Sequence, residues 1–205
     1  MIKNLLFDLG GVIMNIDRNH CMEAFKKLGM ENTDNFLGEY SQTGPFGDLE
    51  SGKISVAEFH QALRPLLPED VTDEQMDEAF SDFLLGIPEY RLNALKELRK
   101  KYKVYILSNT NPIMWNNRIA SEFAKQGGNL STYTDGAITS FEEKVMKPDA
   151  RIFEAACSKL NIKPEETVFL DDSEANTKAA AALGFETIHV APGTEFTELL
   201  KDKGL

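Results

Sequence analysis

The sequence predicts an α/β fold: a parallel sheet flanked by helices, with an all-helical segment inserted after the first strand. Two observations support this prediction. Short apolar runs alternate with amphipathic helical patterns over most of the chain, which is typical of a parallel α/β sheet. Residues 17–90 break the alternation, because three helical patterns occur there and no convincing strand separates them.

The predicted strands are short apolar runs of the kind that is buried on both faces of a parallel sheet. Four runs are strong: IKNLLFD near residue 5, KVYILSN near residue 106, TVFLDD near residue 169 and ETIHV near residue 188. A weaker candidate, DGAITS, lies near residue 138.

Helical patterns fill the intervals between these runs. Residues 91–102 and 149–161 repeat their apolar side chains at helical spacing, so each segment presents one apolar face. Residues 173–184 form a pattern of small residues that ends at Gly184, as expected where a helix closes on a left-handed residue.

The domain boundaries follow from the break in the pattern. Residues 1–16 and 91–205 are expected to form the sheet core, and residues 17–90 a small all-α cap. The connections between them are expected at Ile16–Asp17 and near Pro88–Arg91. A chain of 205 residues, 42% of them hydrophobic, is long enough for one core with a small satellite domain.

The composition narrows the possible partners. The net charge is −11, and an acidic chain repels the phosphates of nucleic acids and anionic lipids, so we expect neither partner. No apolar run approaches the roughly 18 residues of a membrane span, and no signal-peptide pattern occurs. The two cysteines, Cys21 and Cys157, have neither disulfide nor zinc spacing, which fits a reducing compartment. We expect a cytoplasmic protein; the oligomeric state stays open, with a monomer favoured.

Polar side chains stand where the predicted strands end, and ligands of open α/β sheets bind at that edge. Three carboxylates gathered there repel one another unless a cation neutralises them, and Mg²⁺ prefers oxygen ligands. A lysine and a serine could then hold a phosphate against the cation. Each residue taken alone is also explained by turn or cap chemistry, so the prediction rests on their order and spacing. The residues at strand ends are Asp8, Ser108, Asn109, Asp171 and Asp172, and Lys147 begins the helix after the run near residue 138.

Four segments resemble, in order, the four motifs of the haloacid dehalogenase-like hydrolase superfamily: FDLGGV, LSNTN, KPDARIFEAA and TVFLDDSEAN. The resemblance is closest to the branch with sugar-1-phosphate phosphatases and the phosphatase domain of soluble epoxide hydrolase. GDLESGKISVAEFHQAL also resembles the helix-turn-helix of that superfamily's small cap. The resemblance implies a Rossmann-like, doubly wound parallel sheet core with an inserted all-α cap domain. It also implies a Mg²⁺-dependent phosphatase of a small phosphorylated metabolite, such as a sugar 1-phosphate.

The same resemblance implies roles for the matching residues. Asp8 would be the nucleophile that forms an aspartyl-phosphate. Ser108 and the backbone N–H of Asn109 would bind the phosphoryl oxygens, and Lys147 would stabilise the negative charge. This is covalent catalysis with cations on the transferring group.

The resemblance also implies a metal site. Mg²⁺ would be bound by the carboxylates of Asp8 and Asp172 and by the carbonyl of Gly10, which also faces the substrate. Asp171 and Asn176 would lie behind these ligands, orienting Lys147 or metal-bound water.

Gly10 departs from the family pattern, because most phosphatases of this kind have there an aspartate that protonates the leaving group. Loss of such a general acid typically lowers the reaction rate by about 10²–10⁴-fold. The substrate could need little acid assistance, as a phosphate on an anomeric oxygen does. Asp17 or His20 could supply the proton instead. Alternatively, the protein could be a catalytically weak phosphate sensor or partner-binding module.

The expected cap suggests a small substrate, because a cap excludes water when it closes over a site. Residues 43–53 are predicted as a turn above the site, with Phe46, Asp48 and Glu50 as candidate specificity residues. Arg18, at the entrance of the cap, is a further candidate for contact with an anionic group of the substrate. The sequence does not identify the substrate itself.

Overall fold

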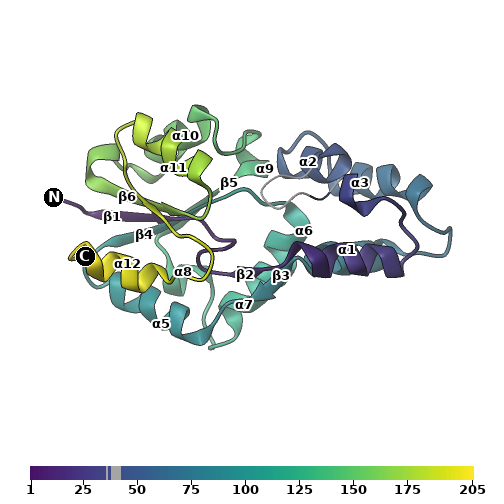
Figure 1. Ribbon diagram of the computed structural model, residues 1–205, viewed down its shortest axis with the longest axis horizontal. Helices are drawn as coiled ribbons and strands as arrows, with labels where there is room; N and C mark the ends of the chain where they lie inside the picture. Colours follow the sequence, from purple (N-terminus) through teal and green to yellow (C-terminus); the bar gives the residue numbers. More distant parts are fainter. Residues whose placement is uncertain (36, 38–42) are drawn as a thin grey trace.

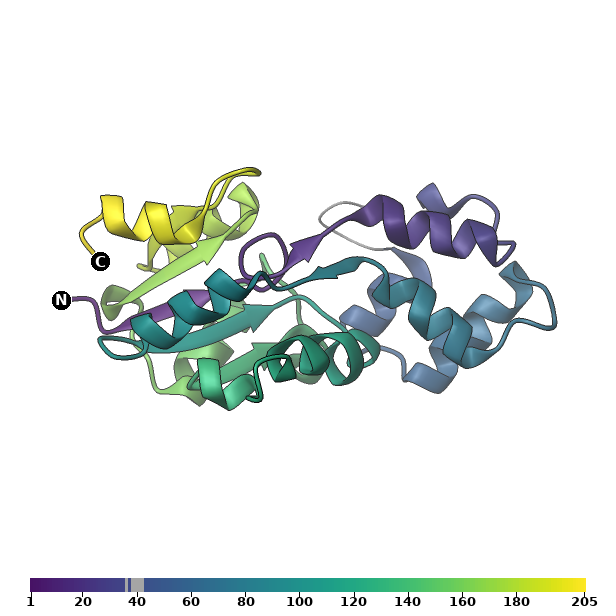
Figure 2. The same ribbon diagram turned by 90° about the horizontal axis from the view of Figure 1, so that it is seen from below.

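The computed structural model describes residues 1–35, 37 and 43–205, which form two parts arranged along the longest axis of the molecule (Figure 1). A sheet with its flanking helices forms one part, and a group of helices forms the other. Both chain ends lie at the end of the sheet part that is remote from this group of helices, as Figure 2 also shows.

The sheet has five parallel strands in the order β5-β4-β1-β6-β7, and all five predicted apolar runs are among them. The chain builds outward from β1 to β5, then returns to the other side of β1 and continues to β7. This reversal creates a switch point next to β1, where ligands of open α/β sheets bind. The strands are β1 Asn4–Phe7, β4 Lys103–Ser108, β5 Gly136–Thr139, β6 Thr167–Asp171 and β7 Glu186–His189.

Helices cover both faces of the sheet, so the doubly wound α/β fold class is confirmed: α10 and α11 lie on one face, α5 and α12 on the other (Figure 1). The helices predicted at 91–102, 149–161 and 173–184 are α5, α10 and α11, and Gly184 has the expected positive φ of 93°. The bounds are α5 Glu89–Leu98, α6 Pro112–Met114, the π-helical turn η3 Trp115–Ile119, α7 Ala120–Ala124, α8 Leu130–Tyr133, α9 Ser140–Glu143, α10 Ala150–Leu160, the 3-10 turn η4 Pro164–Glu166, α11 Glu174–Ala182 and α12 Phe196–Asp202.

The second part, called the helical block below, consists of α1 to α4 with two 3-10 turns. Its centre is aromatic: the ring of Phe46 meets Phe25, Phe59 and Phe80 edge-on, with centroids 5.0 to 5.3 Å apart. Each such pair stabilises the fold by about 0.5–1.5 kcal/mol beyond the free energy gained by burying the apolar area of the rings. The bounds are α1 Arg18–Lys27, η1 Thr33–Asn35, α2 Gly44–Glu50, α3 Val56–Leu63, η2 Arg64–Leu66 and α4 Asp73–Ser81.

A two-stranded antiparallel ribbon, β2 Asn15–Ile16 with β3 Leu84–Gly86, joins the two parts. The prediction that residues 17–90 contain no strand is wrong at β3, because three residues are too few for a periodic pattern. The predicted turn at 43–53 also differs. Its residues 44–50 form helix α2, which has a proline in its first turn, where the missing N–H costs nothing.

None of the helices within residues 1–35, 37 and 43–205 is long and apolar enough to cross a membrane. Cys21 is buried, Cys157 is half-buried, and both are free thiols.

Candidate active site

A pocket lies at the carboxyl ends of β1, β4 and β6, between the sheet and the helical block. Most of the predicted site residues line it. The sheet part contributes Asp8, Gly10, Ser108, Asn109, Lys147, Asp172 and Asn176. The ribbon, the helical block and the segment that joins them contribute Ile16, Glu50, Phe83 and Leu84.

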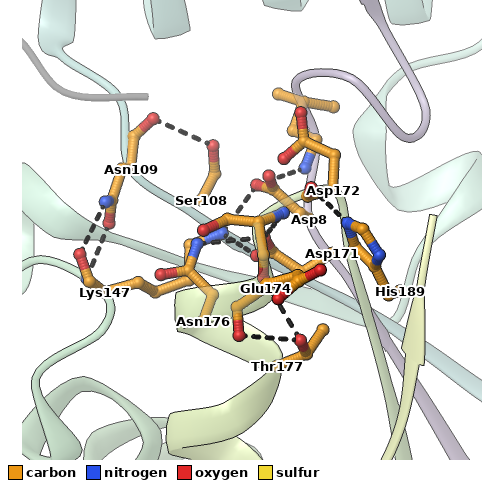
Figure 3. A network of polar contacts seen from close by, with 12 residues as sticks. Asp8, Ser108, Asn109, Lys147, Asp171, Asp172, Glu174, Asn176, Thr177 and His189 are labelled. Carbon is orange, nitrogen blue, oxygen red and sulfur yellow. Dashed lines mark hydrogen bonds and ion pairs between the residues drawn. The ribbon is translucent and has the colours of Figure 1, made fainter. Parts of the chain in front are cut away.

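The ammonium group of Lys147 lies between two carboxylates (Figure 3). Its Nζ is 2.8 Å from Oδ1 of Asp8 and 2.7 Å from Oδ2 of Asp171. Burial lowers the pKa of Lys147, but the charges of Asp171 and Asp8 outweigh burial, so the net shift is upward. Lys147 therefore stays a cation although it is buried.

Asn109 fixes the backbone of Lys147 by a reciprocal pair of hydrogen bonds. Its Nδ2 donates to the carbonyl of Lys147 at 3.1 Å, and the N–H of Lys147 donates to its Oδ1 at 2.9 Å. The sequence does not predict this pair, because the two residues are far apart in the chain. Ser108 is buried beside them, and its hydroxyl makes a long 3.4 Å contact with the carbonyl of Asn109.

Asp171 has hydrogen-bond or ion-pair partners at both carboxylate oxygens. Oδ2 contacts Lys147, while Oδ1 accepts from the N–H of Ser173 at 2.8 Å and from Nδ2 of Asn176 at 2.9 Å. Ser173 precedes α11 and Asn176 lies in its first turn, so the start of this helix holds the carboxylate. Asp171 in turn orients the ammonium group of Lys147.

Asp172 approaches the segment that follows β1. Gly11 has a φ of +73°, and a Cβ there would lie 2.1 Å from Oδ2 of Asp172, so only glycine fits. The ring of His189 donates from Nε2 to the carbonyl of Asp172 at 2.8 Å. The second glycine of the FDLGGV motif thus makes room for the carboxylate of Asp172.

Asp8, Asp171 and Asp172 each offer a carboxylate oxygen within 4.8 Å of the others. Burial raises the pKa of Asp8 to about 8. The charge of Lys147 opposes this shift, and the charges of Asp171 and Asp172 add to it. Burial and Asp171 likewise raise the pKa of Asp172 to about 6. This clustered negative charge suits a hard divalent cation with oxygen ligands, so the side chains present fit Mg²⁺.

Three residues predicted near the cap entrance lie away from this pocket. Arg18 lines a neighbouring cavity, and its guanidinium donates to the carbonyl of Leu37 and to Asp34. Asp17 lines the same cavity and caps α1 by accepting from the N–H of Asn19. The side chain of His20 is 60% exposed.

Of the three candidate specificity residues on α2, the structure places one in the pocket. Phe46 is fully buried within the helical block, and the half-exposed Asp48 pairs with Lys53. Glu50 lines the pocket with a carboxyl group from the last residue of α2. The seven residues of α2 are too few to show which of them face inward, and only tertiary packing brings Glu50 into the same pocket as Asp8.

Comparison with known proteins agrees with this architecture. Residues 2–184 match the family of haloacid dehalogenase-like hydrolases. The chain is 38% identical, over 98% of its length and 97% of the relative's, to a D-ribitol-5-phosphate phosphatase of Bacteroides thetaiotaomicron. It is 24% identical to (S)-2-haloacid dehalogenase 1 of a Pseudomonas species, over 92% of its length and 84% of the relative's.

A solved structure shows the same fold. It is a haloacid dehalogenase-like family enzyme of Bacteroides thetaiotaomicron in complex with magnesium and inorganic phosphate, with a TM-score of 0.90 and 41% identity. The alignment covers 97% of this chain and 99% of that one. With a family match over residues 2–184 and this likeness along nearly the whole chain, the protein belongs to the haloacid dehalogenase-like hydrolases.

Proposed function

We propose that this protein is a Mg²⁺-dependent phosphatase that hydrolyses a small phosphate monoester through an aspartyl-phosphate on Asp8. One observation carries the proposal: the buried cation of Lys147 lies between Asp8 and Asp171, beside Asp172, at the switch point of the sheet. Such a site can bind a phosphoryl group next to a carboxylate nucleophile.

The reaction is a double displacement at phosphorus. A carboxylate oxygen of Asp8 forms a bond to phosphorus while the bond from phosphorus to the leaving oxygen breaks. Lys147 and Ser108 bind the phosphoryl oxygens and stabilise the charge that spreads over them. Water then attacks phosphorus, the bond to Asp8 breaks, and inorganic phosphate leaves.

Asp8, Asp172 and the carbonyl of Gly10 are the groups proposed to hold Mg²⁺, with Asp171 and Asn176 behind them. When bound, the ion neutralises negative charge on the nucleophile and the phosphoryl group. Without the metal ion, burial and the charges of Asp171 and Asp172 raise the pKa of Asp8 and so disfavour the carboxylate that must attack phosphorus. Activity is therefore expected to require the metal.

The substrate class follows from the relatives. D-ribitol 5-phosphate, named for the relative of 38% identity, carries its phosphate on a primary hydroxyl. We propose that this chain acts on a phosphate of a sugar or sugar alcohol. An alkoxide from a primary hydroxyl leaves less readily than an anomeric oxygen. Both types of ester must therefore be assayed to test whether the substrate is a sugar 1-phosphate, as the sequence led us to expect.

Residues 17–90 are proposed to act as a cap. Glu50, Phe83 and Leu84 bring this segment into the wall of the pocket, where it would exclude water around a small substrate and obstruct a macromolecule. A monomeric state, a cytoplasmic location and the lack of nucleic-acid or membrane partners stay predictions from composition.

The test is phosphate release with Mg²⁺ from a sugar 1-phosphate, a sugar 6-phosphate, D-ribitol 5-phosphate and p-nitrophenyl phosphate. Wild-type protein is expected to release phosphate, and a chelator or Asp8→Asn to reduce the rate by more than about 10³-fold. Equal rates for wild type and Asp8→Asn would exclude Asp8 as the nucleophile. Vanadate binding without release from any ester would favour the phosphate-binding alternative.

A further inference from the structure

Glu50 is a buried acid in the pocket that the reaction above does not use. Its side chain lines the same pocket as Asp8 and Lys147, and the residue is 5% exposed. Within residues 1–35, 37 and 43–205, its carboxyl group has no hydrogen bond or ion pair. Its oxygens are not among the fully enclosed polar atoms that lack a partner, so the carboxyl group faces the pocket, where a ligand or substrate can become its partner.

The backbone of Glu50 is anchored to the sheet part. Oγ of Ser140 lies 2.7 Å from the carbonyl of Glu50 and 3.0 Å from that of Thr110, and it accepts from the N–H of Thr110 at 3.0 Å. At Gly52, whose φ is +64°, a Cβ would lie 2.2 Å from the carbonyl oxygen of Phe141. The end of α2 is thus closely packed against α9, and Glu50 is held at the pocket.

The environment of Glu50 favours its neutral form. Burial, assisted by the charge of Asp8, raises the pKa of Glu50 to about 8. Asp48, in the same helix, is half-exposed and paired with Lys53. A protonated carboxylic acid at neutral pH is what a general acid requires.

Gly10 creates the need for such a group. The reaction must protonate the leaving oxygen of an alkyl ester, and Gly10 offers no side chain to do so. In an in-line displacement the leaving oxygen points away from Asp8. The helical block brings the carboxyl group of Glu50 into the same pocket. We propose, on the basis of the function proposed above, that Glu50 is the proton donor to the leaving group.

The two steps balance with Glu50 as both acid and base. In the first, the Asp8 oxygen bonds to phosphorus, the leaving oxygen separates, and the carboxyl proton of Glu50 passes to it. In the second, water bonds to phosphorus, gives a proton to the carboxylate of Glu50, and the bond to Asp8 breaks. The alcohol, phosphate and the original enzyme remain.

The experiment compares Glu50→Gln with wild type on two esters. Release from D-ribitol 5-phosphate, whose alkoxide needs a proton, is expected to fall about 10²-fold or more in kcat. Release from p-nitrophenyl phosphate, whose leaving group departs as a stable anion, is expected to change little. Retained activity on the aryl ester also proves that the variant is folded.

Two further variants sharpen the test. Asp48→Asn, on the same helix but outside the pocket, is expected to match wild type on both esters. Gly10→Asp in the Glu50→Gln background is expected to restore part of the lost activity on the alkyl ester. A side chain fits at position 10, because a Cβ there has its nearest contact with Ile16 at 3.4 Å, an ordinary packing distance.

The outcomes separate this inference from the function on which it rests. Equal losses on both esters, a rise in KM alone, or no loss at all would each overturn the assignment of Glu50 as proton donor while leaving the phosphatase intact. Failure of the wild type to release phosphate from any ester of the panel would overturn the proposed function, and this inference with it.

Discussion

At the scale of single residues, Lys147 and its two carboxylate partners form an ion triad whose members are almost inaccessible to water. The exposed fraction of the side chain is 1% for Lys147 and 0% for Asp171. Breaking a buried ion pair leaves a desolvated charge without compensation, which costs more than the pair contributes when intact. The triad therefore couples the stability of the protein to the residues proposed for catalysis.

Lys147→Met is expected to lower the free energy of unfolding by about 3–5 kcal/mol, because Asp8 and Asp171 lose their shared cation. Adding Asp171→Asn should recover part of this loss, since the amide removes the more deeply buried of the two charges. Urea unfolding in the presence of a chelator measures both values. A double variant less stable than Lys147→Met would show that Asp171 is not stabilised through Lys147.

The raised pKa of Glu50 predicts how stability depends on pH. Its pKa is about 8 in the folded protein against 4.5 for the ordinary group, so between these values the folded state holds a proton that the unfolded chain releases. The contribution of this proton to the free energy of unfolding is complete below pH 4.5. It is lost as pH rises toward 8, by about 1.4 kcal/mol per pH unit.

Glu50→Gln has no proton to lose, so it should become more stable relative to wild type as pH rises over this range. Urea unfolding of both proteins at several pH values, with a chelator present, measures the difference. Parallel pH profiles would mean that Glu50 ionises in the folded protein as an ordinary carboxyl group does.

At the scale of elements, the contact between the end of α2 and α9 decides where Glu50 lies. Gly52 permits this contact in two ways: its φ of +64° suits glycine, and the carbonyl of Phe141 occupies the space that a side chain would need. Gly127 provides a matched comparison, since its φ is +72° but no atom lies within 4 Å of a Cβ placed there.

Gly127→Ala is expected to lower the free energy of unfolding by about 1–2 kcal/mol, because alanine is strained in the left-handed conformation. Gly52→Ala should cost more, because its Cβ must also displace α9, and it should reduce hydrolysis of alkyl phosphates by moving Glu50. Urea unfolding and phosphate release measure these effects. Equal losses of stability and activity in the two variants would show that the contact between α2 and α9 does not position the site.

At the scale of the whole molecule, the protein carries a net charge of −11 and gathers three of its carboxylates at one edge of the sheet. Folding buries these charges and brings Asp8 to Asp171 and Asp172, whereas the unfolded chain keeps Asp8 apart from that pair and leaves all three in water. A cation that binds the folded state alone therefore stabilises the whole protein by mass action.

Saturating Mg²⁺ is expected to raise Tm by about 5–10 °C relative to a chelator, which corresponds to about 2.7 kcal/mol at a hundredfold excess over Kd. Asp172→Asn should raise the Tm of the metal-free protein, because it removes one of the mutually repelling carboxylates, and should largely abolish the effect of Mg²⁺. Thermal unfolding followed by circular dichroism measures both. An undiminished Mg²⁺ effect in Asp172→Asn would place the metal elsewhere.

The sequence predicts the sheet well, because strands buried on both faces leave continuous apolar runs. Even the weak run near residue 138 is a strand, β5. The short elements are harder: β3 has three residues and α2 has seven, too few to show a period. Asp8, Ser108 and the Asp171–Asp172 pair could be predicted from strand ends, and Lys147 from the start of the following helix. Arg18 could not be excluded from the pocket without the structure.

Local periodicity and motifs in chain order are enough to predict the α/β fold class, the helical insertion and the polar residues at the strand ends. Which groups meet depends instead on the packing of distant segments. The bonds between Asn109 and Lys147, and the approach of Glu50 to Asp8, join segments far apart in the chain. Such contacts depend on how helices pack against a sheet, and no local pattern of residues records that packing.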